Sequence, residues 1–133
     1  MKEQYIFFET AKLANEKGFK QIEEKCYDPL CMDVNHIYDW WNERGCSTEE
    51  RMKRLIPAPT QELLKKWLRE VKNIHVNPVP YNETADRSNE ITGYYIGEIM
   101  TTDGKMLSPG DGNYPTYEET LEKGLQIGLN HIE

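Results

Sequence analysis

The clearest periodic pattern of apolar and polar positions lies in the middle of the chain, at residues 61–72. Its apolar side chains fall within an arc of about 140° when successive residues are set 100° apart, with basic side chains on the opposite side. These apolar residues are Leu63, Leu64, Trp67, Leu68 and Val71. The pattern predicts an amphipathic helix that begins after Thr60 and ends near Asn73.

Two more helices are predicted at the ends of the chain. Residues 5–17 carry apolar side chains at helical spacing, and Gly18 followed by Phe19 is typical of a left-handed helix end. A capping box from Thr116 to Glu119 opens a last helix, whose apolar stripe is Tyr117, Leu121, Leu125, Leu129 and Ile132.

Secondary structure is less defined between these helices. Ser47 and Glu50 have the spacing of a capping box, with Ser47 as the N-cap of a short helix that runs toward Leu55. Residues 20–46 are compatible with strand or helix, because their apolar runs are too short for periodicity to decide. Residues 74–79, 91–100 and 105–108 are predicted strands, and Asp103-Gly104 predicts a type I′ hairpin turn between the last two.

These elements predict one α+β domain over residues 1–133. We expect a small antiparallel sheet of about three strands, packed by the central and C-terminal helices, with an additional N-terminal helix. The expected core consists of Leu64, Trp67, Leu68, Leu121, Leu125 and Leu129. Gly124 and Gly128 border the last stripe, which indicates a close approach to the sheet, against Tyr94 or Tyr95, or to a second chain.

Composition narrows the function classes. The chain has 133 residues, 38% of them hydrophobic and 29% charged, and a formal net charge of −7. This acidic balance disfavours a general nucleic-acid binder or a polybasic membrane anchor. The apolar runs are too short to span a bilayer, so no membrane association is expected. Three cysteines, an odd number, fit a reduced cytoplasmic protein.

Three segments carry a resemblance. Residues 8–19 (FETAKLANEKGF), 57–71 (PAPTQELLKKWLREV) and 117–125 (YEETLEKGL) cover both ends and the middle of the chain. In order and spacing they resemble small uncharacterised proteins of gut bacteria and of their phages and prophages. The resemblance implies no activity and no catalytic residue.

A cysteine and histidine cluster is the one metal candidate. Cys26, Cys31, His36 and Cys46 lie within 21 residues and are the ligand types that zinc prefers. Their spacing lacks the paired ligands of structural zinc sites, so small buried thiols and a surface histidine are the favoured interpretation. A nucleophilic Cys31 or Cys46, activated by His36 or His75, is the weaker chemical alternative.

A basic face is the one nucleic-acid candidate. Residues 51–72 hold seven basic and two acidic side chains, and the helix face consists of Lys65, Lys66, Arg69 and Lys72. We favour a solvated helix face, because no aromatic side chains are interleaved for base stacking.

No catalytic motif is present, and neither an enzyme nor a cofactor is expected. The favoured hypothesis is a small phage or prophage accessory protein that binds a macromolecular partner, with an unidentified protein as the partner class. The alternatives are a HicB-like antitoxin or regulatory module, by analogy of residues 91–132 at the level of fold pattern, and a zinc-stabilised small domain. The oligomeric state stays open.

Overall fold

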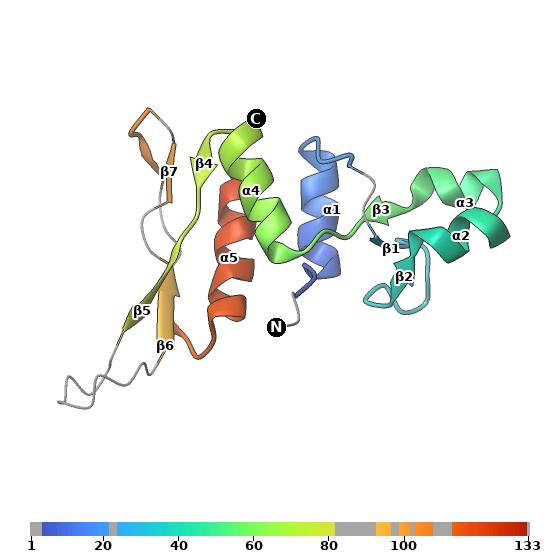
Figure 1. Cartoon of the computed structure of the whole chain (residues 1–133), viewed down its shortest axis with the longest axis horizontal. Coiled ribbons are helices and arrows are strands. Elements are labelled where there is room, and N and C mark those ends of the chain that lie inside the picture. Colours follow the sequence, from blue (N-terminus) through green and yellow to red (C-terminus); the bar gives the residue numbers. More distant parts are fainter. Residues whose placement is uncertain are drawn as a thin grey trace. The chain divides into compact units, whose positions relative to one another are not determined.

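The computed structural model describes residues 4–21, 24–81, 93–96, 99–101, 103–107 and 113–132 (Figure 1). The chain divides into two compact units, residues 1–60 and residues 61–133. Helices and antiparallel strands occur in both units, which confirms the predicted α+β class. The prediction of a single domain stays a prediction.

Over its described residues, the first unit combines three helices with one small sheet. Its strands form an antiparallel sheet in the order β2-β1-β3. The elements are α1 (Phe8–Glu16), β1 (Lys25–Tyr27), β2 (Ile37–Asp39), α2 (Trp40–Cys46), α3 (Glu49–Arg54) and β3 (Ile56–Pro57). The undecided segment 20–46 therefore contains a hairpin followed by a helix.

Helix α1 begins later and ends as the sequence predicts. Tyr5 forms a β-bridge with Thr60, so the predicted start at residue 5 is wrong. At the other end Gly18 has φ +108°, and the Phe19 N–H donates to the Ala14 carbonyl at 2.9 Å. This six-to-one bond is the mark of a Schellman motif, and Phe19 is buried as expected.

Side chains define the starts of α2 and α3. Asp39 caps α2 by accepting from the Trp41 N–H at 2.9 Å, which turns the chain from β2 directly into the helix. Thr48 caps α3 by accepting from the Arg51 N–H at 3.3 Å. The prediction of Ser47 as the N-cap is wrong, because its hydroxyl donates instead to Glu43 at 2.6 Å.

In the described part of the second unit, two helices pack against two three-stranded sheets. The sheet orders are β4-β7-β8 and β5-β6-β9, with antiparallel pairing throughout. The elements are α4 (Gln61–Val71), β4 (Ile74–His75), β5 (Pro78–Tyr81), β6 (Gly93–Ile96), β7 (Ile99–Thr101), β8 (Met106–Leu107), β9 (Asn113–Tyr114) and α5 (Tyr117–Asn130). Helices α4 and α5 contact each other, and both lie on the same side of β4, β5 and β6 (Figure 1).

The core of the second unit is largely the predicted one. Five of the expected core residues are fully buried, namely Leu64, Leu68, Leu121, Leu125 and Leu129. The prediction that Trp67 belongs to this core is wrong. Trp67 is half-buried, and the Lys72 Nζ lies 5.7 Å from its ring centroid. The buried line of α4 runs through Gln61, Leu64 and Leu68, which leaves Trp67 and Val71 at its margin.

Asn73 has φ +60° and ends α4 as predicted.

The two glycines of α5 face the extended chain at β4 and just after it. A Cβ at Gly124 would lie 2.6 Å from Val76 Cγ1, and one at Gly128 would lie 3.4 Å from both Ile74 and Val76. The predicted close approach is therefore present, but Tyr94 and Tyr95 are the wrong neighbours. Strand alternation directs Tyr95 away from α5, while the Tyr94 ring packs edge-on against Tyr117 with centroids 5.8 Å apart.

The β7–β8 hairpin differs from the predicted turn. Thr101 pairs with Lys105 across a three-residue loop, and the Gly104 N–H donates to the Thr101 carbonyl at 3.0 Å. Gly104 has φ +91°, whereas Asp103 has a negative φ, so the turn is not type I′. One left-handed residue after a turn is typical of three-residue hairpin loops.

Candidate functional site

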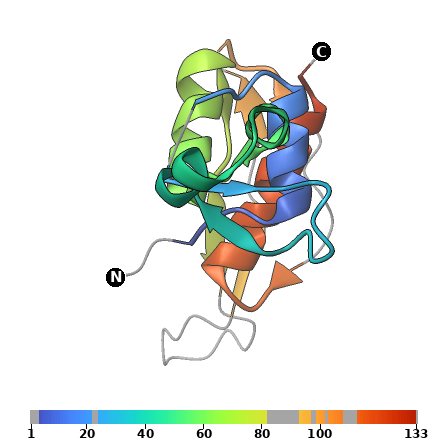
Figure 2. The same cartoon turned by 90° about the vertical axis from the view of Figure 1, so that its right-hand side faces the viewer.

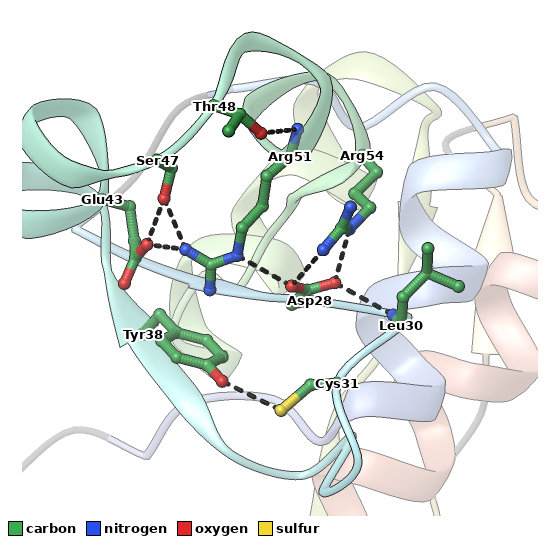
Figure 3. A network of polar contacts seen from close by, with 9 residues as sticks. All are labelled: Asp28, Leu30, Cys31, Tyr38, Glu43, Ser47, Thr48, Arg51 and Arg54. Atoms are coloured by element: carbon green, nitrogen blue, oxygen red, sulfur yellow. Dashed lines mark hydrogen bonds and ion pairs between the residues drawn. The ribbon is translucent and has the colours of Figure 1, made fainter.

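A buried carboxylate organises one end of the β1–β2 hairpin. Asp28 follows β1 directly, and only 4% of its side chain is exposed. Its oxygens accept from Arg51 Nε at 2.9 Å, Arg54 Nε at 2.9 Å and Arg54 Nη2 at 3.1 Å (Figure 3). The hydrogen bond from Arg54 holds the pKa of Asp28 far below its usual range. Asp28 is therefore an anion at neutral pH, and it ties the hairpin to α3.

A second carboxylate completes the network. Glu43 on α2 forms an ion pair with Arg51, whose guanidinium also donates to the Ser47 hydroxyl (Figure 3). Two carboxylates thus face two guanidinium groups, and their formal charges balance. Buried ions are tolerated when they are paired and hydrogen-bonded in this way. The arrangement is structural in character, since both acids are occupied by arginine.

Asp28 also fixes the loop over residues 28–36. Its side-chain Oδ1 accepts from the Leu30 N–H at 3.0 Å, and its backbone carbonyl accepts from the Cys31 N–H at 3.1 Å. A second turn follows, in which the Asp33 carboxylate accepts from the Asn35 N–H at 3.1 Å. Figure 2 shows this loop projecting from the hairpin.

Two apolar side chains stand exposed on this loop. Leu30 is 73% exposed and Met32 is 105% exposed, which for Met32 means no cover at all. The backbone of the loop is held by the bonds around Asp28 and Asp33, which fixes the points from which these two side chains project. We call residues 28–36 the anchored loop.

Tyr38 lies beneath the anchored loop. Its hydroxyl lies 2.9 Å from the Cys31 sulfur, and the Arg51 guanidinium carbon lies 4.8 Å from its ring centroid (Figure 3). The His36 ring packs edge-on against the Tyr38 ring with centroids 4.5 Å apart. The contact with Cys31 raises the pKa of Tyr38, so the phenol stays protonated at neutral pH.

The zinc candidates are distributed over different surroundings. Cys26 is buried with Trp40 and Leu55, and this burial raises the pKa of its thiol to about 11. Cys31 and His36 flank Tyr38 on the anchored loop, and Cys46 is the last residue of α2, with a side chain outside the described part. Among the described residues, no three His, Cys, Asp or Glu side chains could together hold a metal ion. Zinc binding stays the less favoured alternative to buried thiols and a surface histidine.

The basic face of α4 has internal partners. Lys65 lies 3.9 Å from Glu62 and donates to the Tyr117 hydroxyl at 3.4 Å, while Arg69 lies 3.8 Å from Glu70. The Lys72 ammonium lies over Trp67, and Lys66 is exposed. Such exposed pairs contribute little stability, which fits a solvated helix face.

A hollow of about 500 Å³ lies in the second unit, between the end of α4 and the β7–β8 hairpin. Its lining consists of Lys72, Asn73, Thr101, Asp103 and Lys105. Two ammonium groups and one carboxylate face it, close to the negative end of the α4 dipole. These opposing charges select neither an anion nor a cation.

The anchored loop was not found from the sequence. Arg51 and Arg54 lie 23 and 26 residues after Asp28, so no local pattern links them to it. Two features of the sequence point toward this site. Asp28-Pro29 is typical of a turn, and Arg51 and Arg54, three residues apart, share one helix face.

Within the described part of the chain, no helix is both long and apolar enough to cross a membrane. Comparison of the chain with protein-family models, curated proteins and solved structures gave no match.

Proposed function

We propose that this chain is a non-enzymatic accessory protein of phage or prophage type, which binds a protein partner through the anchored loop. One observation carries the proposal: a loop fixed by a buried ion network presents Leu30 and Met32 to solvent. Apolar side chains exposed close together can mark an interaction site, and an ordered backbone lowers the entropic cost of binding there. The resemblance over residues 8–19, 57–71 and 117–125 supports the phage or prophage setting.

The composition of the loop itself favours a protein over a nucleic acid or a lipid surface. Within residues 28–36 the charged side chains are Asp28 and Asp33, and no lysine or arginine is present. Phosphate backbones and anionic lipids are attracted by basic side chains, so this loop offers them no charge contact. An apolar pocket on a partner protein accepts Leu30 and Met32. We further propose that the protein acts in the cytoplasm, in line with its odd number of cysteines.

Site-specific crosslinking tests the proposal. A photoreactive amino acid is placed at Met32 of the full chain, which is then irradiated in an extract of its native host. We expect one discrete crosslinked protein, and its yield should fall at least about tenfold when Leu30→Ser is added, because a lost anchor of this kind costs over 1.4 kcal/mol.

Two controls make the result decisive. The same photoreactive group at Lys53, an exposed position on α3, should give no such product. Leu30→Ser should keep the thermal midpoint of the parent protein, because the Leu30 side chain is exposed. Equal crosslinking from Lys53, or a yield that Leu30→Ser does not change, would refute the anchored loop as the binding site.

A further inference from the structure

Strand β2 lies at one edge of the sheet in the first unit. The sheet order is β2-β1-β3, and among the described residues β2 pairs with β1 alone. The anchored loop ends at His36 and β2 begins at Ile37, so this edge strand is the arm of the hairpin that leaves the loop. The edge is therefore continuous in the chain with the loop that carries Leu30 and Met32.

Backbone hydrogen bonds establish which way the residues of β1 face. The Trp40 N–H donates to the Glu24 carbonyl at 3.1 Å, on the side of β2, and the Ala58 N–H donates to the Lys25 carbonyl at 2.9 Å, on the side of β3. Successive residues of a strand turn their backbone groups to opposite sides. Lys25 therefore faces β3, and the residues on either side of it face β2.

The register of the hairpin then gives the outward groups of β2. Lys25 lies opposite Asp39, and when one member of such a pair faces away from its partner strand, so does the other. Ile37 faces outward by the same alternation, and Tyr38 between them faces β1. Because Asp39 caps α2, its carbonyl belongs to the first turn of that helix. The outward ladder groups of β2 are thus the N–H and carbonyl of Ile37 and the N–H of Asp39.

The two edges of this sheet differ in how they are protected. Strand β3 consists of Ile56 and Pro57, both buried, and Pro57 has no N–H to offer to another strand. Strand β2 contains neither proline nor lysine, and its three residues are half-buried. Edge strands accept a further strand unless residues of this kind, or a covering element, block them.

Exposed apolar side chains lie in the chain on both sides of β2. Leu30 and Met32 precede it in the anchored loop, and Trp41, which is 81% exposed, follows Asp39 by two residues. Tryptophan is among the residues enriched at the energetic centres of interfaces. The strand itself is about 10 Å long, at roughly 3.3 Å per residue. Backbone donors and an acceptor along such an edge are matched by another extended backbone.

We propose that β2 takes up an extended segment of the partner protein as an added strand, an inference that rests on the proposed function of the anchored loop. Main-chain hydrogen bonds to Ile37 and Asp39 hold the segment, and apolar contacts to Leu30 and Met32 select it. A strand of three residues offers few such bonds. The edge alone therefore binds extended chains weakly, and the loop contacts make the association specific.

One substitution at the edge tests this inference in the crosslinking experiment above, with the photoreactive group at Met32 of the full chain. Ile37→Pro removes the outward N–H and leaves the hydrogen bonds of Tyr38 and Trp40 toward β1. The yield of the crosslinked protein should fall at least about tenfold, because a donor is lost and the proline ring occupies its place. Ile37→Val is the matched control. It keeps the N–H and a branched side chain, and its yield should equal that of the parent.

A second measurement needs no substitution at the edge. The crosslinked adduct is purified, and its amide hydrogen exchange is compared with that of unreacted chain from the same irradiated sample. The Ile37 and Asp39 amides should exchange at least about tenfold more slowly in the adduct, because an added strand protects them. This comparison decides the question if circular dichroism shows that Ile37→Pro is unfolded.

The outcomes separate this inference from the proposed function. A Met32 product whose yield a folded Ile37→Pro leaves unchanged overturns strand addition, while binding through the anchored loop stands. Exchange at Ile37 and Asp39 that is equal in adduct and free chain overturns strand addition in the same way. The absence of any product from Met32 overturns the proposed function and this inference together.

Discussion

At the scale of single residues, Asp28 connects three parts of the first unit. One carboxylate accepts hydrogen bonds from Arg51, Arg54 and the backbone N–H of Leu30. It joins the end of β1 and the anchored loop to α3, which is more than 20 residues away in the sequence. Because the carboxylate is buried, removing its charge deprives Arg54 of this anion and leaves Arg51 paired with Glu43 alone.

We predict that Asp28→Asn lowers stability at pH 7 by about 1.5–3 kcal/mol, the range for hydrogen bonds to charged groups. The pKa of Asp28 is lowered in the folded protein, against about 3.9 in an unfolded chain. Its stabilisation is therefore complete above about pH 5 and is lost as the pH falls through 4 and below. Urea unfolding of both proteins from pH 7 to pH 3 should show their difference shrinking in acid.

Asp33→Asn is the matched control for this measurement. Asp33 is exposed in the same loop, and an asparagine can still accept from the Asn35 N–H. Its stability at pH 7 should stay within about 0.5 kcal/mol of the parent. If the free energies of unfolding of the parent and of Asp28→Asn differ by the same amount at every pH, the carboxylate charge does not stabilise the fold.

At the scale of elements, α5 contains two glycines with different surroundings. A methyl group at Gly124 would overlap Val76, whereas one at Gly128 would meet Ile74, Val76 and Leu68 at ordinary contact distances of 3.4–3.5 Å. The branched Val76 side chain is stiff and cannot easily move aside. Alanine is also the better helix former, by about 1 kcal/mol.

We therefore predict opposite outcomes for two identical substitutions. Gly124→Ala should destabilise the protein by about 1–3 kcal/mol through overpacking, while Gly128→Ala should be neutral or stabilising by up to about 1 kcal/mol. The measurement is the urea midpoint of each variant at a constant slope. Each variant serves as the control for the other, and equal shifts would contradict the packing account.

Elements were predictable where local chemistry alone determines them. The end of α1 at Gly18 and Phe19, the cap of α5 at Thr116 and the core positions of α5 all follow from neighbours in the sequence. Trp67 was misplaced because periodicity gives the direction of a side chain and not the width of the surface that covers it.

The anchored loop and the first sheet could not be predicted in this way. Strands β1, β2 and β3 contain two or three residues each, too few for a period of two to be visible. Asp28 meets its arginines only after the hairpin and α3 have come together. Because the exposure of Leu30 and Met32 follows from that tertiary contact, it could not be predicted from the two apolar residues in the sequence.

At the scale of the whole molecule, the two compact units raise a question of cooperativity. Residues 1–60 and 61–133 each have their own buried side chains. A unit of about 60–70 residues buries only about 60% of its unfolded surface and is marginally stable alone. The sequence-based prediction of one domain implies that the units unfold together.

Amide hydrogen exchange of the full chain tests this prediction with two substitutions, one in each unit. If residues 1–133 unfold as one unit, Asp28→Asn should lower protection of the slowest amides in α5, and Gly124→Ala should lower that of the slowest amides in β1, because both changes reduce one shared free energy. Gly128→Ala, which is not expected to destabilise, controls for substitution itself. Protection lost only within the substituted unit would instead establish two independently unfolding domains, each kept folded by its own contacts: the ion network around Asp28 in one, and the packing of α5 against Val76 in the other.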